Sequence, residues 1–91
     1  MSNPHIKMYC SGWCPYCTRA EQLLASKGVE FEKIEVTTPE IRQEMETASN
    51  RHTVPQIFAG DLHLGGFDDI AALERAGKLD DVLSGAVTAL D

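Results

Sequence analysis

The sequence has few cysteines, no long apolar run and a shortage of basic residues. Three cysteines in 91 residues are too few for the disulfide framework that holds small secreted domains together. No stretch approaches the roughly 20 apolar residues of a membrane-spanning helix, and no apolar run follows a basic N-terminal segment as in a signal peptide. We therefore expect a cytoplasmic protein with no membrane partner.

The charge balance and the length limit the partners and the size of the fold. The chain carries 8 basic and 14 acidic residues, a net charge of −6. Nucleic-acid binding calls for a basic patch, so no nucleic-acid partner is expected. A chain of this length suffices for one small core, so residues 1–91 are predicted to form a single domain. We also expect a monomer.

What the sequence does contain is a pair of cysteines three residues apart, at Cys14 and Cys17, with Pro15 directly after the first. Proline is well placed at the first residue of a helix, which puts Cys14 at the N-cap and Cys17 one turn inside, on the same face. The two sulfurs can then form a disulfide with little backbone movement. Because a helix N-terminus has free N–H groups and partial positive charge, it favours the nucleophilic thiolate of Cys14. Cys17 can attack any mixed disulfide that Cys14 forms.

Two other interpretations of this pair are a filled core and a zinc site. Cysteines that only fill a core need no spacer of proline and an aromatic residue. Zinc needs about four ligands, commonly from two close pairs. The remaining candidates, Cys10 and the three histidines, offer no pair at metal spacing. We therefore predict a redox-active pair and no metal site.

Residue patterns predict an alternation of strands and helices. Runs of bulky residues indicate strands, and apolar residues at helical spacing indicate helices. The first strand–helix–strand unit implies a right-handed crossover between parallel strands, and a tight turn at Gly60–Asp61 implies an antiparallel hairpin. The fold class is therefore α/β, a four-stranded mixed sheet flanked by helices, with loose chain ends. The expected elements are strands at 6–10, 29–36, 56–59 and 62–64, and helices at 15–27, from Pro39 to about Ser49, after Gly65–Asp69 as far as Gly77, and around 79–83.

The same spacing predicts the buried side of the first two helices. Residues that recur every three or four positions lie on one face, so the apolar ones are expected to meet the sheet. The predicted inner faces are Cys17, Ala20, Leu23 and Leu24 in the first helix, and Ile41, Met45 and Ala48 in the second.

Three motifs together resemble a known family: Cys14–Cys17, Thr53–Pro55 and Gly65–Asp69. In this order and spacing they resemble the glutaredoxins, and most closely the short bacterial dithiol members. The order of elements looks like the thioredoxin fold, and the resemblance covers nearly the whole chain. It implies a glutathione-dependent thiol–disulfide oxidoreductase. The implied substrates are protein–glutathione mixed disulfides and protein disulfides, with glutathione as co-substrate.

The resemblance also implies roles for individual residues. In glutaredoxins the proline that matches Pro55 is cis and faces the active-site disulfide, so that the backbone before it can pair with a substrate. The glycines before the third helix let a ligand approach closely, and the helix start offers N–H groups to the γ-glutamyl carboxylate of glutathione. Arg42 matches a position that pairs with the glycine carboxylate. The implied catalytic residues and redox-active disulfide are Cys14 and Cys17, and the implied glutathione-binding residues are Tyr16, Arg42, Thr53, Val54, Pro55, Gly66, Phe67, Asp68 and Asp69.

The sequence departs from the family in ways that leave alternatives open. Family members often carry a lysine three residues before the first cysteine, where this chain has Ser11, and Trp13 is more like the thioredoxins. One alternative is therefore a thioredoxin-like dithiol reductase recharged by a flavoprotein. Another is a glutathione-ligated iron–sulfur carrier, which the second cysteine disfavours because it competes by oxidation. Cys10 is extra, and serves either as a further redox thiol or as a small strand-end hydrophobe.

Overall fold

The computed structural model describes residues 4–87, so the loose ends expected at both termini lie largely outside it. The order of elements predicted from the residue patterns is confirmed, with small shifts at their ends. Within residues 4–87 no helix is long and apolar enough to cross a membrane. The elements are β1 (Ile6–Cys10), α1 (Pro15–Ser26), β2 (Phe31–Glu35), α2 (Pro39–Ser49), β3 (Gln56–Ala59), β4 (Leu62–Gly65), α3 (Phe67–Arg75) and α4 (Leu79–Ser84).

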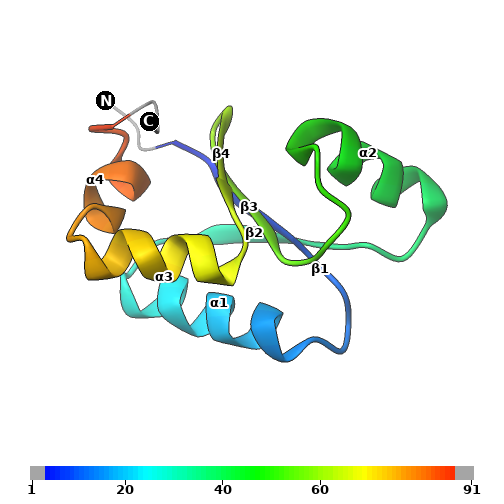
Figure 1. Ribbon diagram of the computed structural model, residues 1–91, viewed down its shortest axis with the longest axis horizontal. Coiled ribbons are helices and arrows are strands. Elements are labelled where there is room, and N and C mark those ends of the chain that lie inside the picture. The colour runs from blue at the N-terminus through cyan, green and yellow to red at the C-terminus, as the bar shows by residue number, and fades with distance from the viewer. Residues whose placement is uncertain (1–3, 88–91) are drawn as a thin grey trace.

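The four strands form one mixed sheet in the order β2-β1-β3-β4. β1 runs parallel to β2 and antiparallel to β3, and β3 runs antiparallel to β4. The sheet stands between α2 on one side and α1, α3 and α4 on the other (Figure 1). β1 is thus a central strand that ends at the loop before α1, which places that loop at the C-terminal edge of the sheet.

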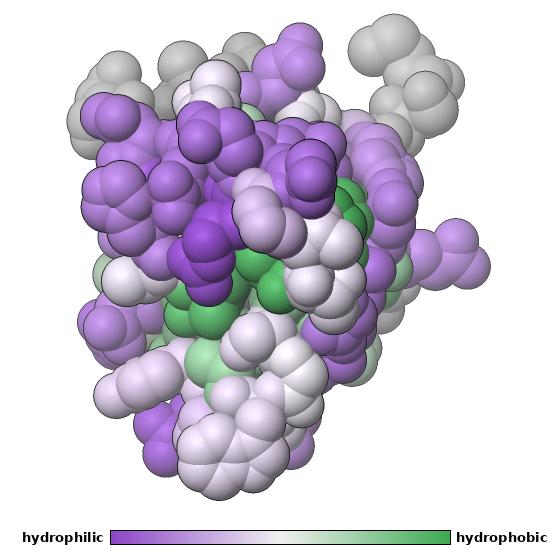
Figure 2. Space-filling view, turned by 90° about the vertical axis from the view of Figure 1, so that its right-hand side faces the viewer, coloured by the Kyte–Doolittle hydropathy of each residue, from purple (hydrophilic) through white to green (hydrophobic). Residues whose placement is uncertain are grey.

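Side chains of β1 alternate between two hydrophobic clusters, as the period of a strand requires. Met8 and Cys10 lie in the larger cluster with residues of α1, α3 and α4. Tyr9 points to the other face, where it forms a small cluster with Met45 of α2 and Phe58 of β3. Partly buried apolar side chains continue this small cluster outward. In the view onto the α2 end of the molecule, a small hydrophobic patch lies below hydrophilic side chains and above side chains of intermediate hydropathy (Figure 2).

The inner face of α2 differs from the prediction at one position. Ala48 is exposed, and Ser49 is buried in its place beside Met45. Positions 41, 45 and 49 follow a strict four-residue spacing, which defines one face of a helix. A serine is tolerated there because its hydroxyl donates to the Met45 carbonyl oxygen at 2.7 Å and accepts from the Arg51 amide at 3.1 Å. The buried polar group is therefore satisfied.

Candidate active site

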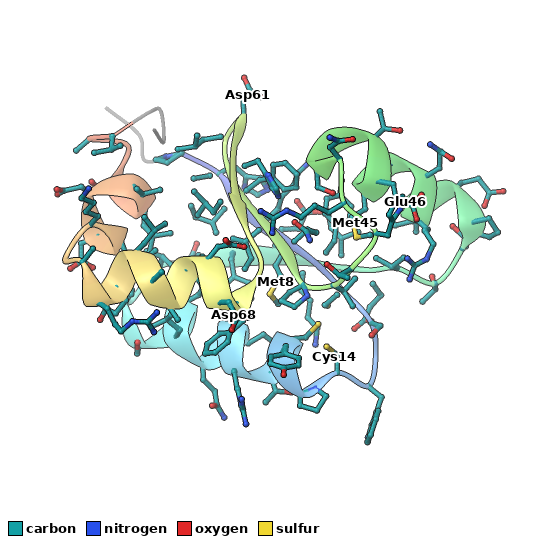
Figure 3. All side chains as sticks on the ribbon, in the orientation of Figure 1. Met8, Cys14, Met45, Glu46, Asp61 and Asp68 are labelled. Carbon is teal, nitrogen blue, oxygen red and sulfur yellow. The ribbon has the colours of Figure 1, made fainter. Side chains whose placement is uncertain are left out.

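Cys14 is the N-cap of α1, as predicted, and its sulfur lies over the first turn of the helix. Its backbone is extended, with φ −154° and ψ 113°, and Pro15 is the first helical residue. The Cys17 amide donates a hydrogen bond to Cys14 Sγ at 3.4 Å. An amide donor and the positive end of a helix both stabilise negative charge on that sulfur. Figure 3 shows Cys14 at this end of α1.

The three cysteines, all free thiols, differ in exposure. Cys14 is partly exposed, whereas Cys17 and Cys10 are 3% and 0% exposed. Burial, together with a hydrogen bond to Cys14, raises the pKa of the Cys17 thiol to about 12. Burial likewise raises the pKa of Cys10 to about 11. Both buried thiols are therefore protonated at neutral pH, which favours the interpretation of Cys10 as a strand-end hydrophobe.

The loop before β3 lies against Cys14. The Val54–Pro55 peptide bond is cis, as the family resemblance implies. The carbonyl oxygen of Val54 is 3.9 Å from Cys14 Sγ. The Val54 side chain packs against both hydrophobic clusters and Pro55 is buried, so the loop is anchored on its inner side. A group bonded to the Cys14 sulfur would lie beside this stretch of backbone.

A bulge in β4 directs the start of α3 toward the loop before β3. Ile57 is paired with Gly65 and Phe58 with His63, so β4 has one residue more than β3 between these two pairs. Such a bulge re-aims the strand that carries it. The chain then turns at Gly65, where φ is +106°, and Gly66 is the N-cap of α3. A Cβ on Gly66 would lie 3.2 Å from the Pro55 carbonyl oxygen, so the two segments meet closely because Gly66 has no side chain.

Asp69 fixes the start of α3 and joins it to Arg51. Its Oδ2 accepts hydrogen bonds from the Gly66 amide and from Arg51 Nη1, each at 2.8 Å. Burial by itself raises the pKa of Asp69, but these hydrogen bonds and the Arg51 charge outweigh it and hold the pKa below its ordinary value. Asp69 is therefore ionised, and it sets the position of the Arg51 guanidinium.

This lowered pKa predicts a difference in stability between the wild type and Asp69→Asn that depends on pH. A carboxyl whose pKa is lower in the folded state contributes stability above its unfolded pKa, about 3.9, and loses it as the pH falls toward the folded pKa. We expect the difference in the free energy of unfolding, measured by urea titration, to be largest above about pH 5 and to shrink toward pH 3. In an Arg51→Gln background the difference should be smaller at neutral pH. A difference that is constant from pH 7 to pH 3 would contradict this account of Asp69.

A groove of about 360 Å³ lies between the loop before β3, the start of α3 and the start of α1. A larger cavity of about 530 Å³ near Gly28 and Val29 is lined by no residue that contacts Cys14. The smaller groove is the better candidate site, because it is lined by Val54, whose carbonyl oxygen is 3.9 Å from Cys14 Sγ. Asp68, at the start of α3, is visible in Figure 3 on the same side of the sheet as Cys14. Within residues 4–87 no three side chains of His, Cys, Asp or Glu are grouped to hold a metal ion. The groove is lined by Tyr16, Arg51, Thr53, Val54, Pro55, Gly66, Phe67, Asp68 and Asp69.

Arg42 and Arg51 differ in their position relative to the groove. Arg42, expected in the site, lies on α2 and is not among the residues that line the groove. Its Nη1 donates to the His52 carbonyl oxygen at 3.1 Å and is 3.6 Å from the Glu46 carboxylate. Arg51, which the sequence analysis did not select, lines the groove. The sequence could have pointed to Arg51 through its position two residues before Thr53, in the segment that leads into the loop.

Comparisons with known proteins agree with the motifs and with the fold. The family model for glutaredoxin matches residues 6–64. The chain is 52% identical over 82 residues to a glutaredoxin of Pseudomonas aeruginosa, covering 89% of this chain and 98% of that protein.

Two solved structures extend the comparison to three dimensions. The solution structure of a glutaredoxin from Brucella melitensis has a TM-score of 0.84 and 49% sequence identity, and the match covers 96% of each chain. The crystal structure of a buckwheat glutaredoxin–glutathione complex has a TM-score of 0.81 and 27% identity, covering 97% of this chain and 83% of that one. The expected thioredoxin fold is therefore confirmed.

Proposed function

Since the chain belongs to the glutaredoxin family, as a dithiol member whose chemistry is thiol–disulfide exchange, we propose that it is a glutathione-dependent oxidoreductase. Its proposed substrates are protein–glutathione mixed disulfides and protein disulfides. The observation that carries the proposal is the groove beside Cys14, which combines a helix N-terminus, a cation and backbone next to the sulfur. The buckwheat relative is a complex with glutathione, which supports glutathione as the co-substrate.

The proposed reaction consists of two exchanges at Cys14. The Cys14 thiolate attacks the glutathione sulfur of a glutathionylated protein, forming a Cys14–glutathione disulfide and releasing the protein as a thiolate. A second glutathione thiolate then attacks the glutathione sulfur of this adduct. The products are glutathione disulfide and the Cys14 thiolate. With a protein disulfide, the Cys14 thiolate forms a mixed disulfide with the protein and releases one protein thiolate. The Cys17 thiol then gives up its proton and attacks the Cys14 sulfur, which releases the second protein thiol and leaves a Cys14–Cys17 disulfide. Two glutathione molecules reduce this disulfide and become glutathione disulfide.

The groove offers complementary groups to the charged ends of a bound glutathione. The N-terminus of α3 presents amides and positive dipole charge to a carboxylate, and Asp68 is an exposed carboxylate beside it for an ammonium group. Arg51 supplies a cation for a second carboxylate. Tyr16, which is 52% exposed, gives an aromatic wall. The proposed glutathione-binding residues are thus those that line the groove.

The test of this proposal is turnover of a glutathione mixed disulfide with a small thiol, coupled to glutathione reductase and NADPH. We expect turnover that is linear in enzyme and saturates with the mixed disulfide. No turnover with glutathione, together with reduction of protein disulfides by a flavoprotein reductase, would favour the thioredoxin-like alternative. A brown protein with visible absorbance after anaerobic purification would instead support a glutathione-ligated iron–sulfur carrier. The monomeric state, the single domain and the cytoplasmic location stay predictions.

Arg51→Ala is expected to raise the KM for the glutathione mixed disulfide by about tenfold, the lower end of what a hydrogen bond to a charged group contributes. The matched control is Arg42→Ala. The side chain of Arg51 is 46% exposed and that of Arg42 is 45% exposed, and each has one carboxylate partner. Because only Arg51 lines the groove, we expect the Arg42 variant to change KM by less than about threefold. A larger rise of KM in Arg42→Ala than in Arg51→Ala would contradict this prediction and support Arg42 as a glutathione-binding residue, as the family resemblance implies.

A further inference from the structure

Gln56 is a fully buried polar residue directly behind the loop that faces Cys14. It is the first residue of β3 and is 0% exposed. Its Nε2 donates to the Thr53 carbonyl oxygen at 3.0 Å and to Thr53 Oγ1 at 3.3 Å. A buried amide has a high cost if any part of it is left unpaired, so its oxygen also needs a donor. That donor comes from β4.

His63 supplies the missing hydrogen bond. Its Nε2 lies 2.7 Å from Gln56 Oε1. Because an amide oxygen can only accept a hydrogen bond, His63 Nε2 is the donor in this contact and carries the proton. Gln56 and Phe58 lie on one face of β3, and His63 is opposite Phe58 in the sheet. The ring of His63 packs at a tilt of 38° against that of Phe58, with centroids 5.0 Å apart, which holds the donor in place.

The surroundings of His63 keep its ring neutral. Burial lowers its pKa, the Arg51 charge lowers it further, and the Asp69 carboxylate acts in the opposite direction. A neutral ring protonated on Nε2 has one N–H donor, and this N–H donates its hydrogen bond to Gln56 Oε1. His63 does not line the groove, so its contact with a bound ligand would be indirect.

We propose that His63, acting through Gln56, is a positioning residue that holds the Thr53–Pro55 backbone in register with Cys14. The chain of contacts runs from His63 Nε2 to Gln56 Oε1, and from Gln56 Nε2 to the Thr53 carbonyl. The next carbonyl, that of Val54, is 3.9 Å from Cys14 Sγ. The inference rests on the proposed function, because it assigns the loop the task of receiving the glutathione part of the substrate.

The position of the donor, and not only its presence, can be tested with three variants. His63→Phe keeps an aromatic ring on Phe58 but has no donor. His63→Gln places an amide nitrogen near the position of the histidine Nε2, and His63→Asn has the same group one methylene shorter. We expect KM for the glutathione mixed disulfide to rise about fivefold in the Phe and Asn variants, the factor that one neutral hydrogen bond contributes. In the Gln variant KM should stay within about twofold of the wild type.

Two further measurements separate positioning from a general loss of structure. The rate of Cys14 alkylation by iodoacetamide should change in the same variants as KM, the Phe and Asn variants, and stay near the wild-type rate in the Gln variant, since the Val54 carbonyl oxygen lies 3.9 Å from Cys14 Sγ. Gln56→Leu combined with His63→Phe should raise KM no more than Gln56→Leu alone, because both changes break one chain of contacts. All assays are made at a temperature where circular dichroism shows each variant folded.

An active wild type with unchanged KM in His63→Phe would overturn this inference and leave the proposed function standing. Equal effects in the Gln and Asn variants, or an alkylation rate that changes equally in all three variants, would also overturn it, because they would point to lost packing. Absence of glutathione turnover in the wild type would instead refute the proposed function.

Discussion

Cys14→Ser is expected to reduce turnover of the glutathione mixed disulfide to the uncatalysed background, whereas Cys17→Ser retains it. A serine hydroxyl is not ionised near neutral pH, so the N-cap amide and helix dipole have no thiolate to stabilise. Cys17 is buried, and burial keeps its thiol protonated. Since the exchange with glutathione needs only the Cys14 sulfur, we expect Cys17→Ser to lower the rate by no more than about twofold.

The same two variants should separate the one-cysteine route from the two-cysteine route. Reduction of a protein disulfide needs Cys17 to resolve the mixed disulfide, so that activity should be lost in both variants. Cys10→Ala is the matched control for removal of a buried thiol, because Cys10 is in the core and away from the groove lining. Its turnover should equal that of the wild type. Equal loss of mixed-disulfide turnover in Cys14→Ser and Cys17→Ser would contradict the proposed route.

Gly65→Ala is expected to be the most destabilising small change near the site, with a cost of at least about 2 kcal/mol in the free energy of unfolding. Two effects add. The backbone at Gly65 has φ +106°, where a side chain is strained, and a Cβ there would lie 2.6 Å from Asp69 Cγ. Asp69 must then move away from the Gly66 amide and from Arg51. We therefore also expect KM for the glutathione mixed disulfide to rise.

Gly28→Ala isolates the backbone contribution to that cost. Gly28 also has a positive φ, +73°, but a Cβ there would have no atom within 4 Å. We expect its cost to be about 1 kcal/mol, with KM unchanged. Urea titration of both variants measures the two costs. If Gly65→Ala costs no more than Gly28→Ala, the contact with Asp69 is not what requires glycine at the end of β4.

Local patterns were sufficient to predict the elements and their caps. The second helix was expected to begin at Pro39, and Thr38 directly before it caps α2, since its Oγ1 accepts from the Ile41 amide at 3.2 Å. Cys14 was expected to cap α1, and the geometry there agrees. In both cases the required information lies within four residues of the position. The parallel pairing of β1 with β2 and the antiparallel hairpin of β3 and β4 followed from the short connections, which leave few alternatives.

Features that depend on distant residues were not predictable in this way. The buried place of Ser49 depends on partners that a hydrophobic pattern does not weigh, namely the Met45 carbonyl and the Arg51 amide. The position of Arg51 at the groove depends on Asp69, which is 18 residues from Arg51 in the chain. The cis bond before Pro55 was expected only from the family motif, since few such bonds are cis.

The burial of Cys10 and Cys17 has a practical consequence for any experiment with thiol reagents. The folded chain holds three cysteine thiols but presents one of them, Cys14, to solvent. A fluorophore or spin label added to the native protein is therefore directed to the groove without removal of the other cysteines. Because the two hidden thiols become reactive only when the core opens, the number of labels per molecule also reports on opening of the core.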